Sequence, residues 1–221
     1  MWLVTDAQGD ELLPWLPQRI FCIGRNYAEH AREMGHDPAL EPPFFFCKPL
    51  TALCAAQGNW QLPDFSEQVE HELELVIGLT VPVNSGRKVG PAEAQTWINS
   101  VALGLDMTCR DLQREAKKAG RPCDLAKGFD NSAVLTPFVQ LGENRLQDFG
   151  DMQLAVNGAL RQQGNWRDML WSPGDLIAQL ARYFTLRSGD IIFTGTPAGV
   201  APLQPGNQLS ASMAGLVHKI D

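Results

Sequence analysis

The sequence predicts an α+β fold that is rich in β-strands and has only a few short helices. Many short apolar runs are separated by glycine and proline, which is typical of strands joined by turns. Stretches with helical periodicity are few, and they do not alternate strictly with the strands as they would in a doubly wound sheet. At 221 residues, 44% of them apolar, the chain is long enough for one domain with a sizeable core.

The first elements are expected between residues 19 and 47. An apolar run predicts a strand over 19–23. Asn26 is expected to cap a short helix over 27–34, which Gly35 ends. Three prolines make the next segment an irregular loop, and the apolar run at 44–47 predicts a buried strand.

The middle of the chain adds two strands and two helices. Residues 69–77 alternate polar and apolar side chains, as a strand does. A proline suited to a first helical turn predicts a helix over 91–100, and a strand follows over 101–106. A second helix is predicted over 112–119, where a glycine ends it.

The last third of the chain contains further strands and a capped helix. Asn157-Gly158, between two apolar segments, is a strong signal for a β-hairpin. The run from Ser172 to Asp175 resembles a capping box and opens an amphipathic helix that reaches Tyr183. A buried strand is expected at 191–193, and Pro205-Gly206 marks a turn before a final strand pair.

Composition argues against several classes of protein. The net charge of −7 and the pI near 5.1 are the reverse of what a nucleic-acid partner requires. No apolar stretch approaches the ~18–20 residues that span a bilayer, and the acidic N-terminus does not resemble a signal peptide. We therefore expect neither a nucleic-acid nor a membrane partner, and we expect a short N-terminal extension over 1–18 before one domain over 19–221.

Cysteine usage predicts a reducing, cytoplasmic location. The number of cysteines is odd, and no two of them form a C-x-x-C pair. Neither a disulfide framework nor a thiolate zinc site is therefore indicated. The cysteines are Cys22, Cys47, Cys54, Cys109 and Cys123.

Three glutamates occupy alternate positions of the strand predicted at 69–77. Glu70, Glu72 and Glu74 would share one face, because successive side chains of a strand alternate. Glutamate is disfavoured in strands, and like charges on one face repel each other. Two explanations are open: a solvated outer face of an antiparallel sheet, or a site for a hard divalent cation, which prefers carboxylate oxygens.

A metal site needs a further ligand, and Asp106 is the best candidate. It follows an apolar strand where the chain turns into a helix. Asp111 competes for the role but also suits the start of that helix, where the dipole favours a carboxylate. Glu72, Glu74 and Asp106 would supply three oxygen donors and leave positions for water and substrate, an arrangement typical of Mg²⁺.

Seven motifs follow one another along the chain from its first predicted strand to the C-terminal region. Each is weak alone, but seven in register are specific. They are Gly24–His30, Phe46–Pro49, Val69–Leu75, Gly104–Asp111, Lys127–Asp130, Val156–Gly158 with Arg161-Gln162, and Ser188–Val200. Together they resemble the fumarylacetoacetate hydrolase family, in particular its short single-domain branch of acylpyruvases, fumarylpyruvate hydrolases and oxaloacetate decarboxylase-like proteins.

The resemblance implies a mixed β-roll of packed sheets, assembled as a homodimer, with residues 19–221 as the catalytic domain. It implies one Mg²⁺ per active site, with Mn²⁺ or Ca²⁺ as alternatives, and maps the metal ligands to Glu72, Glu74 and Asp106. The substrates of similar proteins are small anionic 2-oxo acids. They chelate the metal through the carboxylate and the adjacent keto oxygen.

Two positions depart from the pattern of the family. The family often has tryptophan after the Gly-x-Pro step, whereas this chain has the run Gly120-Arg-Pro-Cys-Asp124. Cys47, before a lysine, commonly corresponds to an aliphatic residue. Neither position is a metal ligand, so these departures bear on substrate preference more than on chemistry.

His30 and Glu33 lie three residues apart and so share one face of a short helix. Such a pair is most often an incidental feature of an exposed helix. The resemblance implies instead a lid over the substrate, in which the pair polarises water or moves a proton. Glu29 is the weaker alternative partner for the histidine.

Other cationic and polar residues are candidates for holding the substrate. A lone lysine is usually a surface residue, but the resemblance makes Lys127, in a loop before a strand, a ligand for an oxyanion or a carboxylate. Gly195 and Gly199, on either side of a candidate threonine, also have a simpler role in turn geometry. The pair Arg161-Gln162 is expected to be structural. The candidate substrate contacts are Arg25, Lys48, Arg110, Gln113 and Thr196.

The resemblance implies a Mg²⁺-dependent hydrolase that cleaves a C–C bond in a 3-acylpyruvate such as acylpyruvate or fumarylpyruvate. The metal would stabilise an enolate while His30 with Glu33 activates water and Lys127 holds the oxyanion. Oxaloacetate decarboxylase and oxaloacetate keto–enol tautomerase, a 2-oxo-acid isomerase, are alternatives at the same site. Two other classes stay open: a non-catalytic divalent-cation-binding module, and a structural β protein whose glutamates are solvated.

Overall fold

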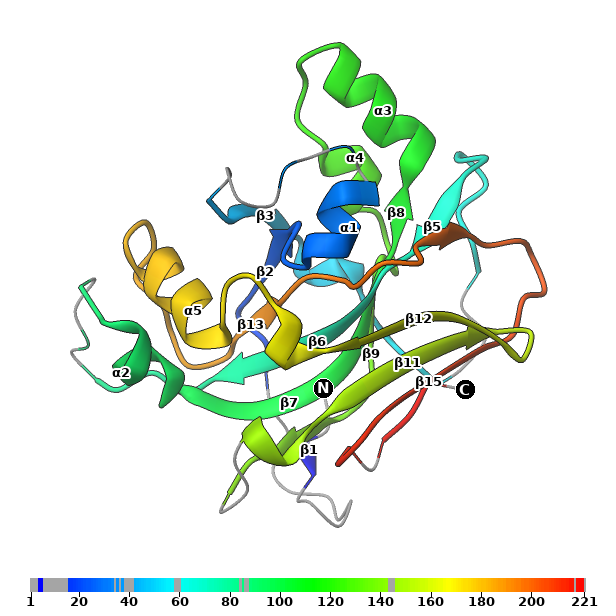
Figure 1. Cartoon of the computed structure of the whole chain (residues 1–221). Coiled ribbons are helices and arrows are strands. Elements are labelled where there is room, and N and C mark those ends of the chain that lie inside the picture. The colour runs from blue at the N-terminus through cyan, green and yellow to red at the C-terminus, as the bar shows by residue number, and fades with distance from the viewer. Residues whose placement is uncertain are drawn as a thin grey trace.

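The computed structural model contains curled β-sheets with a few short helices packed around them (Figure 1). This arrangement confirms the predicted β-rich α+β class and its mixed β-roll. The structure describes residues 4–5, 16–33, 35, 37, 42–57, 61–83, 85, 88–142, 146–216 and 218–220.

The largest sheet has nine strands within the described residues and is mixed. Its strands are β1 (Val4–Thr5), β2 (Arg19–Gly24), β3 (Phe44–Lys48), β4 (Leu53–Ala55), β6 (Leu73–Leu79), β7 (Ile98–Asp106), β9 (Ala133–Leu135), β10 (Phe138–Gln140) and β13 (Asp190–Phe193). Their order is β1-β10-β7-β6-β13-β2-β3, with β9 paired to both β7 and β4. β13 is parallel to β2 and antiparallel to β6.

Two three-stranded sheets and five α-helices complete the described part of the fold. One sheet has the order β12-β11-β15 and the other β14-β5-β8. These strands are β5 (Val69–His71), β8 (Thr108–Cys109), β11 (Asp151–Val156), β12 (Ala159–Asn165), β14 (Ala201–Pro202) and β15 (Leu209–Met213). The helices are α1 (Ala28–Glu33), α2 (Pro91–Gln95), α3 (Arg110–Lys118), α4 (Asp124–Lys127) and α5 (Pro173–Ala181), with 3₁₀ turns at Leu50–Ala52, Leu146–Asp148 and Trp166–Asp168.

The core lies on both faces of the central strands, and all seven residues of β6 are buried. Leu73 and Leu75 face a large core that includes residues of α5 and of the β11–β12–β15 sheet. Val76 faces a second core together with residues of β13. Because side chains alternate along a strand, Glu74 lies on the same face as Val76. The fold therefore turns this carboxylate toward the protein interior.

Several predicted elements are confirmed. The strands expected at 19–23 and 191–193 are β2 and β13. Asn157-Gly158 joins β11 to β12 with φ values of 52° and 77°, as a type I′ hairpin turn requires. The capping box at Ser172 is present, although the helix that it opens ends at Ala181 and not at Tyr183.

The acidic segment at 69–77 was predicted to be one strand, but the structure has two strands there. The ladder breaks at Glu72, so that β5 joins a small sheet and β6 the large one. At the break the backbone N–H of Leu73 donates to the side-chain oxygen of Gln162, 3.0 Å away. Residues on both faces are buried, and the alternative of a solvated outer face is therefore wrong.

The helix predicted over 91–100 is also shorter than expected. It ends at Gln95, and the chain enters β7 at Ile98. Trp97 and Ile98 are buried, and the carbonyl oxygen of Trp97 accepts a hydrogen bond from the N–H of Thr80 at 2.9 Å. Core packing and strand pairing thus override the helical signal.

Two further expectations near the N-terminus are corrected. Asn26 does not cap α1: its amide donates to the carbonyl oxygens of Trp171 and Thr194 and accepts from the N–H of Trp171. The strand predicted as buried at 44–47 is β3, which lies at the edge of the sheet, and its Phe44 is 45% exposed.

Part of the predicted N-terminal extension is an edge strand, since β1 pairs in parallel with β10. The rest of residues 1–15, with Met34 of the predicted helix and Pro38 of the predicted loop, lies outside the described residues. None of the helices that the structure describes is long and apolar enough to cross a membrane.

Candidate metal centre and active site

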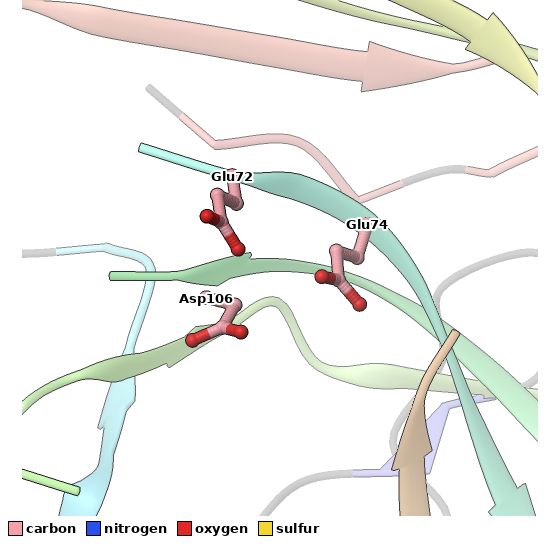
Figure 2. A group of neighbouring side chains, drawn as sticks. All are labelled: Glu72, Glu74 and Asp106. Atoms are coloured by element: carbon pink, nitrogen blue, oxygen red, sulfur yellow. The ribbon is translucent and has the colours of Figure 1, made fainter. Parts of the chain in front are cut away.

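Three carboxylates converge where the acidic strand breaks (Figure 2). Glu72 lies at the break, Glu74 on β6, and Asp106 at the end of the neighbouring β7. The backbone N–H of Asp106 donates to the carbonyl oxygen of Glu72 at 2.9 Å, which holds the two chain segments together. One oxygen from each carboxylate lies within 4.8 Å of the others, and all three residues are buried. The structure thus brings together the three predicted metal ligands.

Buried cations surround this carboxylate group. Lys127 Nζ lies 2.7 Å from both Glu72 Oε2 and Asp106 Oδ2. Arg110 Nη2 donates to Glu72 Oε1 at 2.6 Å, and its Nε donates to Glu70 Oε2 at 2.5 Å. Since a buried charge is costly without a partner, these pairs explain how so many carboxylates can be buried together.

The charges set opposite pKa shifts on the two neighbouring glutamates. Burial alone would raise the pKa of Glu72, but the charges of Lys127 and Arg110 hold it well below its usual range. Burial raises the pKa of Glu74, and the negative charges of Asp106 and Glu72 raise it further. Glu74 is therefore the carboxylate of the group that most lacks a compensating positive charge.

The residues present fit a hard divalent cation. All three ligands are carboxylates, the donors that Mg²⁺ and Mn²⁺ accept. Asp106 Oδ1 is buried and forms an ion pair with Lys48 Nζ at 2.8 Å, but among the described residues it accepts no hydrogen bond. Glu74 Oε2 accepts from the N–H of Gly195 at 2.7 Å. A cation placed among the three would supply the charge that Glu74 lacks.

Two of the three carboxylates, Glu72 and Glu74, line a cavity of about 290 Å³, whereas Asp106 is not among its lining residues. Most predicted site residues line it, which brings the proposed proton-transfer, substrate and metal groups together. Its lining includes Arg25, His30, Glu72, Glu74, Arg110, Gln113, Lys117, Arg121, Cys123, Lys127 and Thr196. Cys123, one of the two departures from the family pattern, is thus part of the cavity wall, whereas Cys47 is not among the lining residues.

His30 lines the cavity from α1 and is only 6% exposed. Its Nδ1 lies 3.5 Å from Glu33 Oε2, and the Glu33 carboxylate in turn accepts from the N–H of Gly199. Burial lowers the pKa of His30, and the negative charges of Glu72 and Glu33 oppose this only in part. His30 is therefore neutral near pH 7. Glu29, the alternative partner, is exposed.

Two predicted residues lie elsewhere than expected. Lys48 does not line the cavity: it is buried behind Asp106, where its ammonium donates to Ser132 Oγ and to the carbonyl oxygens of Met107 and Lys127. Lys127 was expected in a loop, but it is the last residue of the one-turn helix α4. Lys127 thus reaches the cavity from α4, and Lys48 instead forms a buried ion pair with Asp106 at 2.8 Å.

Asp111, which competed with Asp106 as a ligand, faces away from the carboxylates. It accepts hydrogen bonds from Ser66 Oγ and from the N–H groups of Glu67 and Leu112 at the start of α3. Its neighbour Gln113 lines the cavity and accepts from Arg110 Nη1 at 2.6 Å.

Gln162 is the main residue whose connection to the site the sequence does not reveal. Its Oε1 accepts from the N–H of Leu73 and lies 2.8 Å from His71 Nδ1, while its Nε2 donates to Thr196 Oγ1 and to the carbonyl oxygen of Pro197. The amide therefore ties the strand break beside Glu72 to the Thr196 wall. Its place in the Arg161-Gln162 motif was the only available signal, and that pair was expected to be structural.

Replacing Gln162 with leucine should destabilise the protein by at least ~2 kcal/mol, because the buried N–H of Leu73 and the carbonyl of Pro197 would lose their partner. Urea unfolding followed by circular dichroism measures the change. Gln163→Leu is the matched control, since Gln163 is exposed on the same strand. Equal losses of stability in the two variants would contradict this role.

Comparison with known proteins agrees with the fold and identifies the family. The family model for the fumarylacetoacetate (FAA) hydrolase C-terminal domain matches residues 19–219. Oxaloacetate tautomerase YcgM of Escherichia coli is 40% identical over 211 residues, covering 92% of each chain. A mitochondrial oxaloacetate decarboxylase of Dictyostelium discoideum is 36% identical over 204 residues, covering 90% of each chain. A crystal structure of fumarylpyruvate hydrolase from Pseudomonas aeruginosa with Mn²⁺ and pyruvate superposes with a TM-score of 0.88 at 36% identity, covering 99% of this chain and 93% of that one.

A strand-rich fold with three converging buried carboxylates, two of which line a cavity, defines a class of protein suited to divalent-cation chemistry. The chain belongs to the fumarylacetoacetate hydrolase family and is an enzyme of that family. The resemblance drawn from the seven motifs is confirmed.

Proposed function

We propose that this enzyme interconverts the keto and enol forms of oxaloacetate with the help of a divalent cation, Mg²⁺ or Mn²⁺. The observation that carries the proposal is that Glu72 and Glu74, which converge with Asp106, line the same small cavity as a neutral, buried His30. A tautomerase needs both: a site that stabilises the enolate and a group that moves one proton. The tautomerase name of the Escherichia coli relative supports this alternative over the hydrolase that the sequence placed first.

A divalent cation held by Glu72, Glu74 and Asp106 would act as a Lewis acid and stabilise negative charge on the keto oxygen. The chain's own residues position the carboxylates and bind the substrate. Arg110 and Lys127 fix Glu72 in place and keep it ionised. Thr196 Oγ1 accepts from Gln162 Nε2, and its own hydroxyl has only a long contact, 3.5 Å, to the carbonyl oxygen of Pro197, so it can donate to a substrate carboxylate instead.

His30 moves the proton in this proposal. Its Nδ1 lies toward Glu33, which favours the tautomer with the proton on Nδ1 and leaves Nε2 as the base. Nε2 takes the proton from C3 of the keto form to give the enolate and then delivers it to the C2 oxygen to give the enol; conversion of the enol to the keto form runs through the same two steps in reverse. Glu33 orients the ring and steadies the imidazolium that forms between the two steps.

Cleavage of a 3-acylpyruvate is the second candidate, favoured by the close structural match to a fumarylpyruvate hydrolase. The leaving group in that reaction is the enolate of pyruvate, which the same site would stabilise. The additional requirement is a water molecule that His30 activates for attack on the distal carbonyl carbon. Decarboxylation of oxaloacetate also passes through this enolate and needs no water.

A panel of three substrates separates these reactions. Chelator-stripped enzyme is mixed with Mg²⁺ and with oxaloacetate, acetylpyruvate or fumarylpyruvate, while enol absorbance, pyruvate and CO₂ are followed; Mg²⁺ alone is the blank. We expect faster enol–keto exchange of oxaloacetate without CO₂ or pyruvate. Pyruvate formed in proportion to an acylpyruvate would establish the hydrolase instead, and CO₂ from oxaloacetate would establish the decarboxylase.

The pH dependence should show the lowered pKa of His30. Only neutral His30 can take a proton, so kcat/KM should fall as the pH drops through a value below the ordinary 6.5 of histidine. Protonation of the buried ring should also cost stability, since the unfolded chain binds the proton more readily over this window. Measurement of kcat/KM between pH 5 and 8 tests this. An acid limb centred clearly above pH 6.5 would contradict the assignment.

We also propose a homodimer and a cytoplasmic location. Phe65 and Leu125 are large exposed apolar residues that line one groove, which supports burial against a second copy. All five cysteines are free thiols, which supports a reducing compartment. Sedimentation equilibrium and cell fractionation, respectively, test the two proposals, and a monomer or a mitochondrial fraction would contradict them.

A further inference from the structure

The wall of the cavity formed by α3 contains more cationic side chains than those that form salt bridges with buried carboxylates. Arg110, Gln113 and Lys117 lie at spacings of three and four residues and so share one face of α3. All three line the cavity, as does Arg121, just after the helix. Lys117 is about 10 Å further along the helix axis than Arg110, at 1.5 Å per residue. Figure 1 shows α3 extending from the end of β8 away from the central strands β6 and β7.

The cations at the two ends of this wall differ in their partners. Arg110 is bound to Glu70 and Glu72, and Lys127 to Glu72 and Asp106. Among the described residues, neither Lys117 nor Arg121 forms a salt bridge. The positive charges of Arg110 and Lys127, beside the carboxylate triad, are thus compensated within the protein. Those of Lys117 and Arg121, further from the triad, are available to a ligand.

Arg25 adds a fifth cation to the cavity lining, besides Arg110, Lys117, Arg121 and Lys127. Its φ of 61° is unusual for a residue other than glycine, and its guanidinium lies 5.2 Å from the centroid of the Phe44 ring. Burial lowers the pKa of Lys117, and the charges of Arg110 and Arg25 lower it further, as expected where like charges gather.

We propose that Lys117 and Arg121, together with Arg25, form a subsite that binds a second carboxylate of the substrate. The preferred substrates are then dicarboxylic 2-oxo acids, whose oxo-acid end meets the carboxylate triad and whose other end meets these cations. The inference rests on the proposed function for the oxo-acid end only. It also explains how an acidic chain attracts a dianion, because nearby charges outweigh a distant net charge.

The test compares oxaloacetate with its 4-methyl ester, which has the same oxo-acid end but no second charge. KM, kcat and calorimetric affinity in the presence of Mn²⁺ are measured for wild type, Lys117→Gln, Arg121→Gln and the double variant. Lys118→Gln is the matched control, because Lys118 is exposed on the same helix but does not line the cavity.

We expect the double variant to bind oxaloacetate roughly tenfold more weakly while its affinity for the ester and its kcat stay unchanged. The preference of the wild type for oxaloacetate should shrink as salt is added, since the cations are exposed. An ester bound as tightly as oxaloacetate, or an equal loss in Lys118→Gln, would overturn the subsite and leave the reaction standing. If oxaloacetate binds more tightly than the ester but neither compound is turned over, the subsite is supported and the proposed reaction is overturned. If neither compound binds, both the subsite and the proposed reaction are overturned.

Discussion

Replacing Glu74 with glutamine should abolish metal-dependent turnover without weakening the metal-free fold. The amide has nearly the shape of the carboxylate and can still accept from the N–H of Gly195. It removes one of three crowded negative charges, so the metal-free variant should melt at or above the temperature of the wild type. Loss of a metal ligand should cost more than the ~10–100-fold that loss of an outer-shell partner costs in affinity or activity.

Differential scanning fluorimetry with and without Mg²⁺ measures both parts of this result. Wild type should gain about 2.7 kcal/mol of stability at a metal concentration one hundred times Kd, and the Glu74→Gln variant should gain much less. Glu67→Gln is the control, because Glu67 is exposed on the segment before the triad. A variant that keeps the full metal-dependent shift would show that Glu74 is not a ligand.

Replacing His30 with glutamine should lower kcat by ~10²–10⁴-fold, the usual contribution of a positioned acid or base. Metal affinity should stay unchanged, because His30 contacts none of the three carboxylates in the hydrogen bonds and salt bridges of the described residues. Stopped-flow measurement of enol decay, together with Mn²⁺ titration, separates the two effects.

Two neighbours on the same helix provide the controls. Glu33→Gln should lower kcat less than His30→Gln, since Glu33 acts through the ring, whereas Glu29→Gln should have no effect because Glu29 is exposed. A loss in Glu29→Gln larger than that in Glu33→Gln would reverse the assignment of the partner. Unchanged turnover in His30→Gln would remove His30 from the mechanism.

The metal ligands could be predicted because their signal is local. Glu72 and Glu74 are two residues apart in a strand, and this spacing alone directs both side chains to one face. Asp106 follows from the end of the next long apolar strand, which pairs with the first. Those two facts made the three carboxylates candidates, the family resemblance selected them over Asp111 and over a solvated face, and the structure brings them together.

The surroundings of the ligands could not be predicted because they depend on distant pairings. Gln162 reaches the strand break across 89 residues, and Lys48 reaches Asp106 from the edge strand β3. A lysine before a proline carries no sequence signal that separates a substrate contact from a buried partner of an aspartate. Likewise, the end of α2 is set by the pairing of β7 with β6, and no local residue marks it.

The most direct test of the account is to measure oxaloacetate enol–keto exchange by chelator-stripped wild-type enzyme before and after Mg²⁺ or Mn²⁺ is added. We predict exchange at the rate of the metal-only blank without metal, and restored catalysis once either ion is present. Undiminished catalysis after complete removal of metal would contradict a metal centre at Glu72, Glu74 and Asp106.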